Sequence, residues 1–399
     1  MGSVNLDNTG SGSAVTLSSD GTSLLLDGTA VGGGADLYAA NESSPNAQPS
    51  ATGANAVAIG DRAVASNEDA LGIGTDTDAT GLSSTALGRG AQATANYNLA
   101  IGLNATASAQ RATAIGNNGV TAGSVYSTAI GNNSSFGGSQ TATGSAAMAL
   151  GGSYASGADS FAAAIANNTS SYGATGANSV AIGQTARSAQ TNAVALGGNS
   201  LANGVYSFAF GGTASGSYSV AFGGTASGTA AVNLLGGTAS GERSLAVGFR
   251  SSATKYGQKA FASGRFAADG DAQGSIFILR SDTTNATAEA MTTNNSTAAA
   301  TNQVVAASDT CIMFSGTIVA MQNGAADQGG WEIKGLLKND GGTTTLVNSE
   351  VKTFADGNGW SIVLSADNTN NALKVQCTGE ASHNIRWVAN IQTSEVTYA

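Results

Sequence analysis

Side chains able to support catalysis or metal binding are few in this 399-residue chain, which has one histidine, His383, and two cysteines, Cys311 and Cys377. His383 follows a Gly-Glu-Ala-Ser turn signal, and the sequence offers neither a serine–histidine–aspartate arrangement nor a His/Cys metal cluster around it. We therefore expect an exposed turn histidine. The cysteines lie in predicted strands, so we expect buried free thiols, with a disulfide between them as the alternative.

Two pairs of aspartates have the close spacing of oxygen-rich metal sites: Asp76 with Asp78, and Asp269 with Asp271. Calcium favours such clusters, but turn chemistry accounts for the same residues equally well. No carboxylate pair stands out as the acid and base of glycoside hydrolysis. We expect no catalytic, metal-binding or cofactor-binding residue and no enzyme activity. A glycan depolymerase with carboxylates paired across loops or subunits is an alternative.

Composition narrows the protein class. The chain contains 56 glycines but only two prolines, so a collagen helix is excluded. Its formal net charge of -10 disfavours nucleic-acid binding, which needs clustered Lys and Arg. No apolar run approaches the ~18 residues of a membrane span, and the first residues lack the pattern of a secretory signal. We therefore expect synthesis in a cytoplasm and no membrane insertion.

The elements that would position any site come from an internal repeat. An apolar residue followed by glycine recurs at steps of 12 to 20, most often 14, giving about 15 units with Ser263-Gly264 as a degenerate member. The apolar residues expected to form the trimer or roll core are Ile59, Ile73, Leu87, Ile101, Ile115, Ile130, Leu150, Ile165, Ile182, Leu196, Phe210, Phe222, Leu235 and Val247. The expected strand-ending glycines are Gly60, Gly74, Gly88, Gly102, Gly116, Gly131, Gly183, Gly197, Gly211 and Gly223.

Each unit predicts one coil of a narrow β-solenoid. Residues 56–59 alternate small and large side chains, as a strand does, and residues 62–65 form a second short strand. Coils stacked ~4.8 Å apart would extend over roughly 70 Å. The roll has room for alanine inside, so we expect the larger column to face outward as an apolar stripe that drives self-association. In the alternative, this column faces inward and alanines form the contact.

Three copies of the motif resemble a known family. Residues 55–60 (Asn-Ala-Val-Ala-Ile-Gly), 178–183 (Asn-Ser-Val-Ala-Ile-Gly) and 218–223 (Tyr-Ser-Val-Ala-Phe-Gly) are similar to the head repeats of YadA-type trimeric autotransporter adhesins. That resemblance implies left-handed parallel β-rolls packed as a homotrimer. The chain departs from those adhesins because it shows no signal peptide, heptad stalk or C-terminal membrane-barrel segment.

The flanks of the repeat suggest a different carrier. Residues 4–10 resemble the start of fibre-like virion proteins of tailed bacteriophages, and residues 331–335 and 385–389 are similar to a β-rich terminal domain of phage fibre proteins. We divide the chain by composition into five parts. These are a β-hairpin or virion-attachment segment (1–33), a linker (34–53), the β-roll (54–266), a neck (267–274) and a C-terminal domain (275–399).

The C-terminal domain is predicted as an antiparallel β-sandwich or jelly roll, which makes the whole chain all-β. Residues 281–302 show little periodicity and read as a surface excursion. Alternating apolar positions include the three tryptophans, Trp331, Trp360 and Trp387, which we expect in the core. An exposed tryptophan would instead be able to stack on a sugar ring. Turn signals separate the predicted strands at 325–327, 339–342, 356–359, 367–370 and 379–382.

Taken together, these patterns and resemblances predict a homotrimeric, non-enzymatic phage tail fibre or capsid fibre. It would be made in the bacterial cytoplasm and act outside the cell in the virion. Its partners would be its own copies, other virion proteins at the N-terminus, and a host-surface glycan or protein at the C-terminal domain. The alternatives are a bacterial adhesin fragment, the depolymerase, or a C-terminal domain that only starts trimerisation. Loop residues proposed for receptor contact are Asp327, Asn339, Asp340, Asn358, Asn368, Asn370 and His383.

Overall fold

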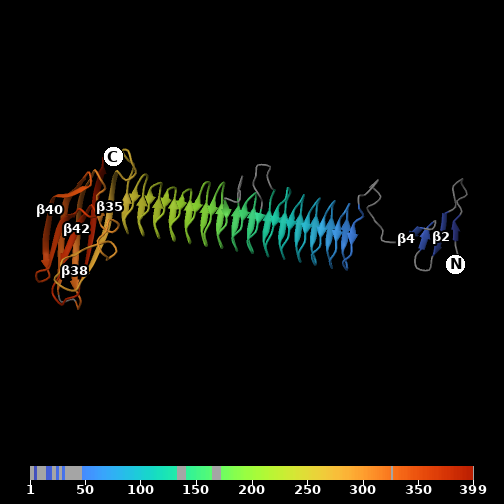
Figure 1. Cartoon of the computed structure of the whole chain (residues 1–399), viewed down its shortest axis with the longest axis horizontal. Helices are drawn as coiled ribbons and strands as arrows, with labels where there is room; N and C mark the ends of the chain where they lie inside the picture. The colour runs from blue at the N-terminus through green and yellow to red at the C-terminus, as the bar shows by residue number, and fades with distance from the viewer. Residues whose placement is uncertain are drawn as a thin grey trace.

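The computed structural model describes residues 4–6, 15–19, 24–26, 29–31, 47–132, 141–163, 172–324 and 327–398. The elements of these residues are β-strands, which form a long rod of stacked coils followed by a domain of longer strands (Figure 1). Within the described ranges, no helix is long and apolar enough to span a membrane. The predicted all-β fold, a parallel solenoid followed by antiparallel sheet, is confirmed.

The solenoid has about 14 turns, close to the 15 coils predicted, and each coil contributes one strand to each of two parallel sheets. The first sheet, here the apolar sheet, contains β6 (Val57–Ile59), β8 (Leu71–Ile73), β10 (Thr85–Leu87), β12 (Leu99–Ile101), β14 (Thr113–Ile115), β16 (Thr128–Ile130), β18 (Met148–Leu150), β20 (Phe161–Ala163), β22 (Val180–Ile182), β24 (Val194–Leu196), β26 (Phe208–Phe210), β28 (Val220–Phe222), β30 (Val232–Leu234), β32 (Leu245–Val247) and β34 (Lys259–Phe261). The second, here the polar sheet, contains β5 (Ser50–Ala51), β7 (Val64–Ala65), β9 (Asp78–Ala79), β11 (Gln92–Ala93), β13 (Thr106–Ala107), β15 (Thr121–Ala122), β17 (Thr141–Ala142), β19 (Tyr154–Ala155), β21 (Gly173–Ala174), β23 (Arg187–Ser188), β25 (Leu201–Ala202), β27 (Thr213–Ala214), β29 (Thr225–Ala226), β31 (Thr238–Ala239) and β33 (Ser252–Ala253).

Alanine fills the space between the two sheets. The middle residue of most apolar-sheet strands and the second residue of most polar-sheet strands are alanines with no exposed surface, such as Ala100 and Ala107. Because a side chain on a strand alternates between faces, the first and third residues of each apolar-sheet strand then point outward. The preferred prediction, alanine inside and large apolar residues outside, agrees with this arrangement.

The predicted apolar column needs correction at two positions. In β30, Leu234 pairs with Phe222 and Val247, so Leu234 rather than Leu235 occupies the column. Leu235 has a φ of 72° and takes the place that glycine fills after β28. In β20 the column residue is Ala163, which pairs with Ile182. Ile165, named for this position from the sequence, lies outside the described residues.

The coils stack closely at the glycines that end the apolar-sheet strands. All ten predicted strand-ending glycines have positive φ, from 65° at Gly211 to 150° at Gly131. At Gly102, with a φ of 120°, a Cβ atom would collide with the carbonyl oxygen of Gly116 in the next coil. Glycine is therefore required there both by backbone conformation and by the approach of the neighbouring coil.

The N-terminal strands form an antiparallel sheet of four: β1 (Val4–Leu6), β2 (Val15–Ser19), β3 (Leu24–Leu26) and β4 (Thr29–Val31). The predicted hairpin is present as β2 and β3, with Leu17 opposite Leu26, and the other two strands extend it. Ser18 and Ser19 also pair with β3, opposite Leu25 and Leu24. Strand β5 lies inside the range predicted as linker, because the Ser50 N–H donates to the Ala63 carbonyl of the next coil at 2.7 Å.

The C-terminal domain continues the apolar sheet. Strand β35 (Ala272–Thr283) pairs antiparallel with β34 and is followed in space by β43 (Ile385–Thr397), β38 (Thr310–Gln322), β39 (Gln328–Asp340) and β40 (Thr343–Asp356). Figure 1 shows β35 beside the solenoid and β40 farther from it. The antiparallel turn at β35 therefore ends the parallel stack and caps its last coil.

A smaller antiparallel sheet covers the inner face of these strands. It contains β36 (Glu289–Ala290), β37 (Val304–Val305), β41 (Ser361–Asp367) and β42 (Ala372–Thr378), with β42 paired to the other three. The core between the sheets contains all three tryptophans, at most 3% exposed, with the rings of Trp331 and Trp387 5.4 Å apart. The core placement of the tryptophans agrees with the strand parity. The segments between successive strands from β39 to β43 overlap four of the predicted turn regions, and residues 325 and 326 of the fifth lie outside the described residues.

The expectation of a surface excursion at 281–302 is wrong at both ends of that segment. Ser281 and Thr283 belong to β35, and Met291 and Thr292 are buried. At the other end Asn302 is 2% exposed, and its Nδ2 donates to the carbonyl oxygen of Thr297 at 2.9 Å. The segment lacks strand periodicity because polar side chains hold it to the domain instead of an alternating apolar face.

Candidate functional site

The outer face of the apolar sheet is the largest chemical feature of the solenoid. The third residue of every strand in this sheet is apolar: Ile59, Ile73, Leu87, Ile101, Ile115, Ile130, Leu150, Ala163, Ile182, Leu196, Phe210, Phe222, Leu234, Val247 and Phe261. Several of these side chains are well exposed, including Phe210 at 53% and Ile182 at 41%. A contiguous apolar surface of this length is unusual on a soluble monomer and is typical of a surface that binds a partner.

The outer face of the polar sheet has a different composition. Its outward positions include Asp78, Gln92, Thr106, Thr121 and Arg187, which are suited to water. The two faces of one thin roll therefore differ in hydropathy although both are built on the same alanine interior. The hydropathy of the rod therefore differs between its two sides.

The apolar face continues into the C-terminal domain. Lys259 of β34 pairs with Ile276 of β35, so Ile276 and Ile278 point to the same side as the solenoid column. Next to β35 this side becomes polar, because Gln392 and Asn390 of β43 lie opposite Ile276 and Ile278. Farther along the strands, Val388 of β43 lies opposite Val319 of β38. Val319 is 59% exposed and Ile278 is 41% exposed. The outward-facing residues of these strands mix apolar and polar side chains, so they gave no clear apolar pattern in the sequence.

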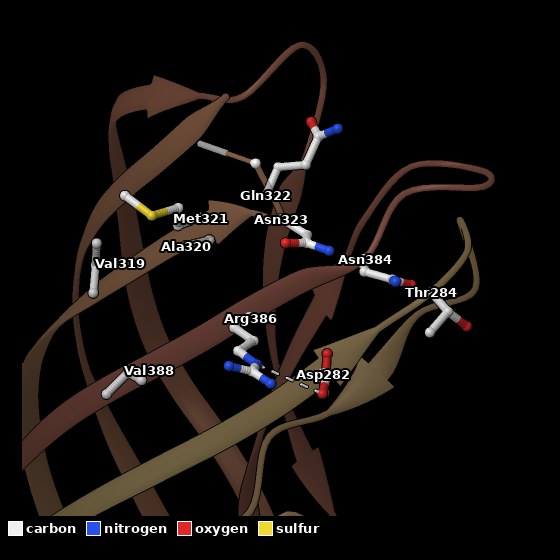
Figure 2. Close-up of a pocket in the computed structure, with 11 residues that line it drawn as sticks. Asp282, Thr284, Val319, Ala320, Met321, Gln322, Asn323, Asn384, Arg386 and Val388 are labelled. Carbon is white, nitrogen blue, oxygen red and sulfur yellow. Dashed lines mark ion pairs between the residues drawn. The ribbon is translucent and has the colours of Figure 1, made fainter. Parts of the chain in front are cut away.

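A pocket with a cavity volume of about 690 Å³ interrupts this face at the ends of β35, β38 and β43. Figure 2 shows Val319, Met321 and Val388 on one side of the pocket and the amide side chains of Asn323 and Asn384 on the other. The Arg386 guanidinium lies 3.9 Å from the Asp282 carboxylate at its edge. Apolar walls with amides and an ion pair suit a ligand that has both hydrophobic faces and hydroxyl or amide groups.

The predicted receptor-contact loops separate into two groups on opposite sides of the domain. Register places residues 323–324 and the segments at 356–359 and 379–384 at one end of the strands, because Gln322 pairs with Ile385 and Gly329 with Asp356. The loops at 339–343 and 367–371 lie at the other end, where the Thr344 N–H donates to Asn368 Oδ1 at 2.7 Å. One flat receptor surface therefore does not contact all five loops together.

Individual contact candidates also differ in their exposure. Asn339 is only 1% exposed and its Nδ2 donates to the Ala306 carbonyl at 2.8 Å, so its role is structural and the contact prediction for it is wrong. Asp340 is exposed but paired with Lys338, which lowers the pKa of its carboxyl group. Asn358 and Asn368 are exposed, whereas Asp327, Asn370 and His383 are half-buried. None of the seven candidates lines the pocket, although Asn323 and Asn384 come from two of the predicted loops.

Three of the four aspartates considered for calcium, Asp76, Asp269 and Asp271, have other partners. Asp76 forms an ion pair with Arg62, and hydrogen bonding from that guanidinium lowers the pKa of Asp76. Asp269 forms an ion pair with Arg265 at 2.6 Å. Burial raises the pKa of Asp271, but hydrogen bonds from the backbone N–H groups of Ala268, Phe266 and Ala267 outweigh it, and the net shift is downward. Among the described residues, no group of three or more His, Cys, Asp and Glu side chains forms a metal site.

The two cysteines and the histidine are the remaining side chains that could react. Cys377 is buried and Cys311 half-buried, and both are free thiols. Burial raises the pKa of the Cys377 thiol to about 12, so it is protonated and unreactive at neutral pH. His383 lies in the predicted turn, with its Nδ1 3.3 Å from Glu380 Oε2.

Comparison with known proteins supports the repeat assignment. The family model of the YadA head domain repeat (2 copies) matches residues 51–77, 79–97, 99–118, 174–200, 190–213 and 239–267. The chain therefore carries YadA head repeats within its solenoid. No curated protein sequence matches the chain.

Two solved structures of phage tailspikes show a distant likeness. One is the tailspike protein gp49 from Acinetobacter baumannii bacteriophage Fri1, described as a capsular polysaccharide depolymerase, at 9% identity and a TM-score of 0.20. That comparison covers 82% of this chain and 69% of the other. The second is the tailspike of Acinetobacter baumannii phage AM24, at 7% identity and a TM-score of 0.18, covering 82% of this chain and 57% of that one. Similarity at this level does not extend to activity.

Proposed function

We propose that this chain is a non-enzymatic structural fibre of a bacteriophage virion, a tail fibre or a capsid fibre, that assembles as a homotrimer. The observation that carries the proposal is the outward column that stays apolar in every coil and continues onto β35. Burying such a column against identical copies removes its apolar area from water along the whole rod. The YadA head repeats within the solenoid also support assembly as a homotrimer.

Each part of the chain has a separate task in this proposal. The N-terminal strands attach to other virion proteins, and the solenoid is a stiff spacer of fixed length. The C-terminal domain contacts a host-surface glycan or protein through the pocket between residues 323–324 and 384–388. The fibre is made in the cytoplasm of the host bacterium and acts outside the cell as part of the virion.

A charge on the apolar face tests the assembly. We expect Ile101→Asp to prevent trimer formation, because an unpaired carboxylate in the buried interface costs several kcal/mol. The matched control is Thr106→Asp, which places the same charge on the polar face of the same coil. Light scattering should give a reduced mass for the first variant and a trimer for the second. Two trimers of equal heat stability would contradict the assignment of the interface.

A bacterial trimeric adhesin is the second candidate, and the match to the YadA head repeat favours it. The two candidates differ in where the protein is found. We expect mass spectrometry to detect the chain in purified phage particles. Detection only in the envelope fraction of uninfected bacteria would favour the adhesin. The depolymerase alternative predicts clearing of a bacterial capsule by the purified protein, and we expect no clearing.

A further inference from the structure

One corner of the solenoid contains a row of residues with left-handed backbone conformation. Each lies two positions before a strand of the apolar sheet, and we call the set the corner row. Its members are Asn55, Asp69, Ser83, Tyr97, Arg111, Tyr126, Ala146, Asp159, Asn178, Asn192, Tyr206, Tyr218, Ala230, Arg243 and Gly257. Their backbone N–H groups donate to carbonyls of the preceding coil, as Tyr218 does to Val205 at 2.8 Å.

The tyrosines in this row have an unfavourable backbone conformation. Positive φ is tolerated by Gly, Asn and Asp, and it is unfavourable for a bulky aromatic residue. Tyr206 and Tyr218 nevertheless have φ values of 56° and 59°, and their side chains are 53% and 61% exposed. Core packing therefore does not explain them, since both rings lie at the surface. Positive φ is common to the whole row, including the exposed Tyr97 and Tyr126, so it is set by the corner of each coil. The neighbours of each ring then decide whether one of its faces is free.

In one part of the row, here the filled part, an arginine side chain lies between two tyrosine rings. Tyr97, Arg111 and Tyr126 come from three successive coils, and the Arg111 guanidinium lies 5.4 Å from the centre of each tyrosine ring. Coils two apart are separated by about 10 Å, and a planar group in van der Waals contact on both sides needs roughly 7–8 Å. The corner row therefore accommodates one flat group between residues two coils apart.

A second stretch of the row, Tyr218, Ala230 and Arg243, has the same spacing, but its middle residue is an alanine. Tyr206 and Tyr218 stack with ring centroids 5.1 Å apart and planes 5° from parallel. The next corner residue beyond Tyr218 is Ala230, which has only a methyl group, and Arg243 follows it. The face of Tyr218 that points away from Tyr206 therefore borders an open slot above Ala230. This slot is bounded by a tyrosine ring on one side and an arginine on the other.

The far wall of the slot supplies hydrogen-bonding groups. Arg243 packs over the Tyr256 ring at 5.5 Å and its Nη1 donates to the Tyr256 hydroxyl at 2.6 Å. Its Nε lies 3.6 Å from Glu242 Oε1. An aromatic face opposite a guanidinium and a carboxylate suits a ligand with an apolar C–H face and several hydroxyls.

We propose that the slot above Ala230 binds one pyranose ring of a polysaccharide, with its C–H face on Tyr218 and its hydroxyls toward Arg243 and Glu242. This places a glycan contact on the rod, away from the C-terminal pocket. The idea rests on the proposal that the chain is a fibre acting at a bacterial surface. Neutral and acidic polysaccharides share the pyranose ring, so both kinds are tested.

Saturation-transfer NMR on the full chain tests the slot with three soluble probes: maltoheptaose, chitohexaose and an oligogalacturonate. We expect at least one probe to bind, and Tyr218→Asn to weaken that binding at least tenfold while removing the backbone strain. Ala230→Arg should weaken it similarly, because it fills the slot as Arg111 fills its own position. Tyr97→Asn, in the filled part of the row, is the matched control and should bind as the parent does.

Light scattering on the same samples separates this proposal from the fibre proposal. We expect Tyr218→Asn and Ala230→Arg to keep the mass of the parent. Binding of none of the three probes, or equal binding by both slot variants, would overturn the slot. A reduced mass for Tyr218→Asn would also overturn it, because the ring would then belong to the assembly contact. Failure of the fibre proposal appears separately, as a monomeric parent chain.

Discussion

Asn233 is an exception to the alanine interior at the scale of single residues. It is the middle residue of β30, has no exposed surface, and pairs in register with Ala221 and Ala246. Neither its Oδ1 nor its Nδ2 has a hydrogen-bond partner. Asn98 is also buried, but its Nδ2 donates to the Ala107 carbonyl at 2.6 Å and its Oδ1 accepts the Ala112 N–H at 3.1 Å. The same amide is therefore unsatisfied in one coil and satisfied in another.

Alanine substitution at these two positions should have opposite effects. Asn233→Ala should raise the free energy of unfolding by about 1–3 kcal/mol, since it removes an unsatisfied buried amide. Asn98→Ala should lower it by about 0.5–1.5 kcal/mol for each lost hydrogen bond. Urea unfolding followed by circular dichroism measures both. Two changes of the same sign would refute this account of the interior.

The two thiols should differ in reactivity. With a folded-state pKa of about 12, above the usual 9.0, Cys377 stays protonated at pH 8 and is buried. Because its pKa is raised on folding, its contribution to stability is complete below pH 9 and is lost as the pH rises toward 12. Iodoacetamide at pH 8 should label the half-buried Cys311 in native protein and Cys377 only in urea. Mass spectrometry of tryptic peptides reads this directly, and native labelling of Cys377 would contradict its burial.

At the scale of elements, alternation in the sequence predicted those strands that have one strictly buried side, and it missed β36, β37 and β40. The parity of Trp331 and Ile333, or of Trp387 and Ile391, identified the core of the C-terminal domain because long antiparallel strands alternate strictly. Register in the short solenoid strands was harder to predict. Leu234 and Leu235 are both leucine, and only the backbone, with φ of 72° at Leu235, shows which one ends the strand.

Features that depend on contacts between distant segments were not accessible from the sequence. The pocket forms where residues 282–284, 319–324 and 384–388 meet, and no local pattern links these segments. Asn339 carried a turn signal yet is buried, because its amide binds Ala306, which is 33 positions away in the chain. Turn chemistry predicts where the chain reverses and does not predict which polar side chains face the solvent.

The width of the coil is set by its inner alanines, and this can be tested within one coil. Ala100→Leu should lower the free energy of unfolding by at least about 1–3 kcal/mol, because the added carbons meet the stacked alanines at 86 and 114. Thr106→Val on the polar face of the same coil is the control and should stay within about 0.5 kcal/mol of the parent. Urea unfolding of both variants measures the difference. An Ala100→Leu protein as stable as the parent would mean that the interior has spare volume.

At the scale of the whole molecule, one sheet connects the solenoid to the C-terminal domain. The register from β34 to β35 keeps the outward side of the rod on the outward side of the domain. The apolar face of the solenoid therefore reaches Ile276 and Ile278 of β35, and polar residues such as Asn390 follow it on the outward side of β43. We expect the apolar face of the solenoid to be buried between identical copies.

The most direct test of that claim is the solution mass of the full chain, measured by light scattering at low protein concentration. The account predicts three times the 38.8 kDa of one chain. A mass of 38.8 kDa that persists as the protein concentration is raised would contradict it, because the apolar face would then remain in water on a stable monomer.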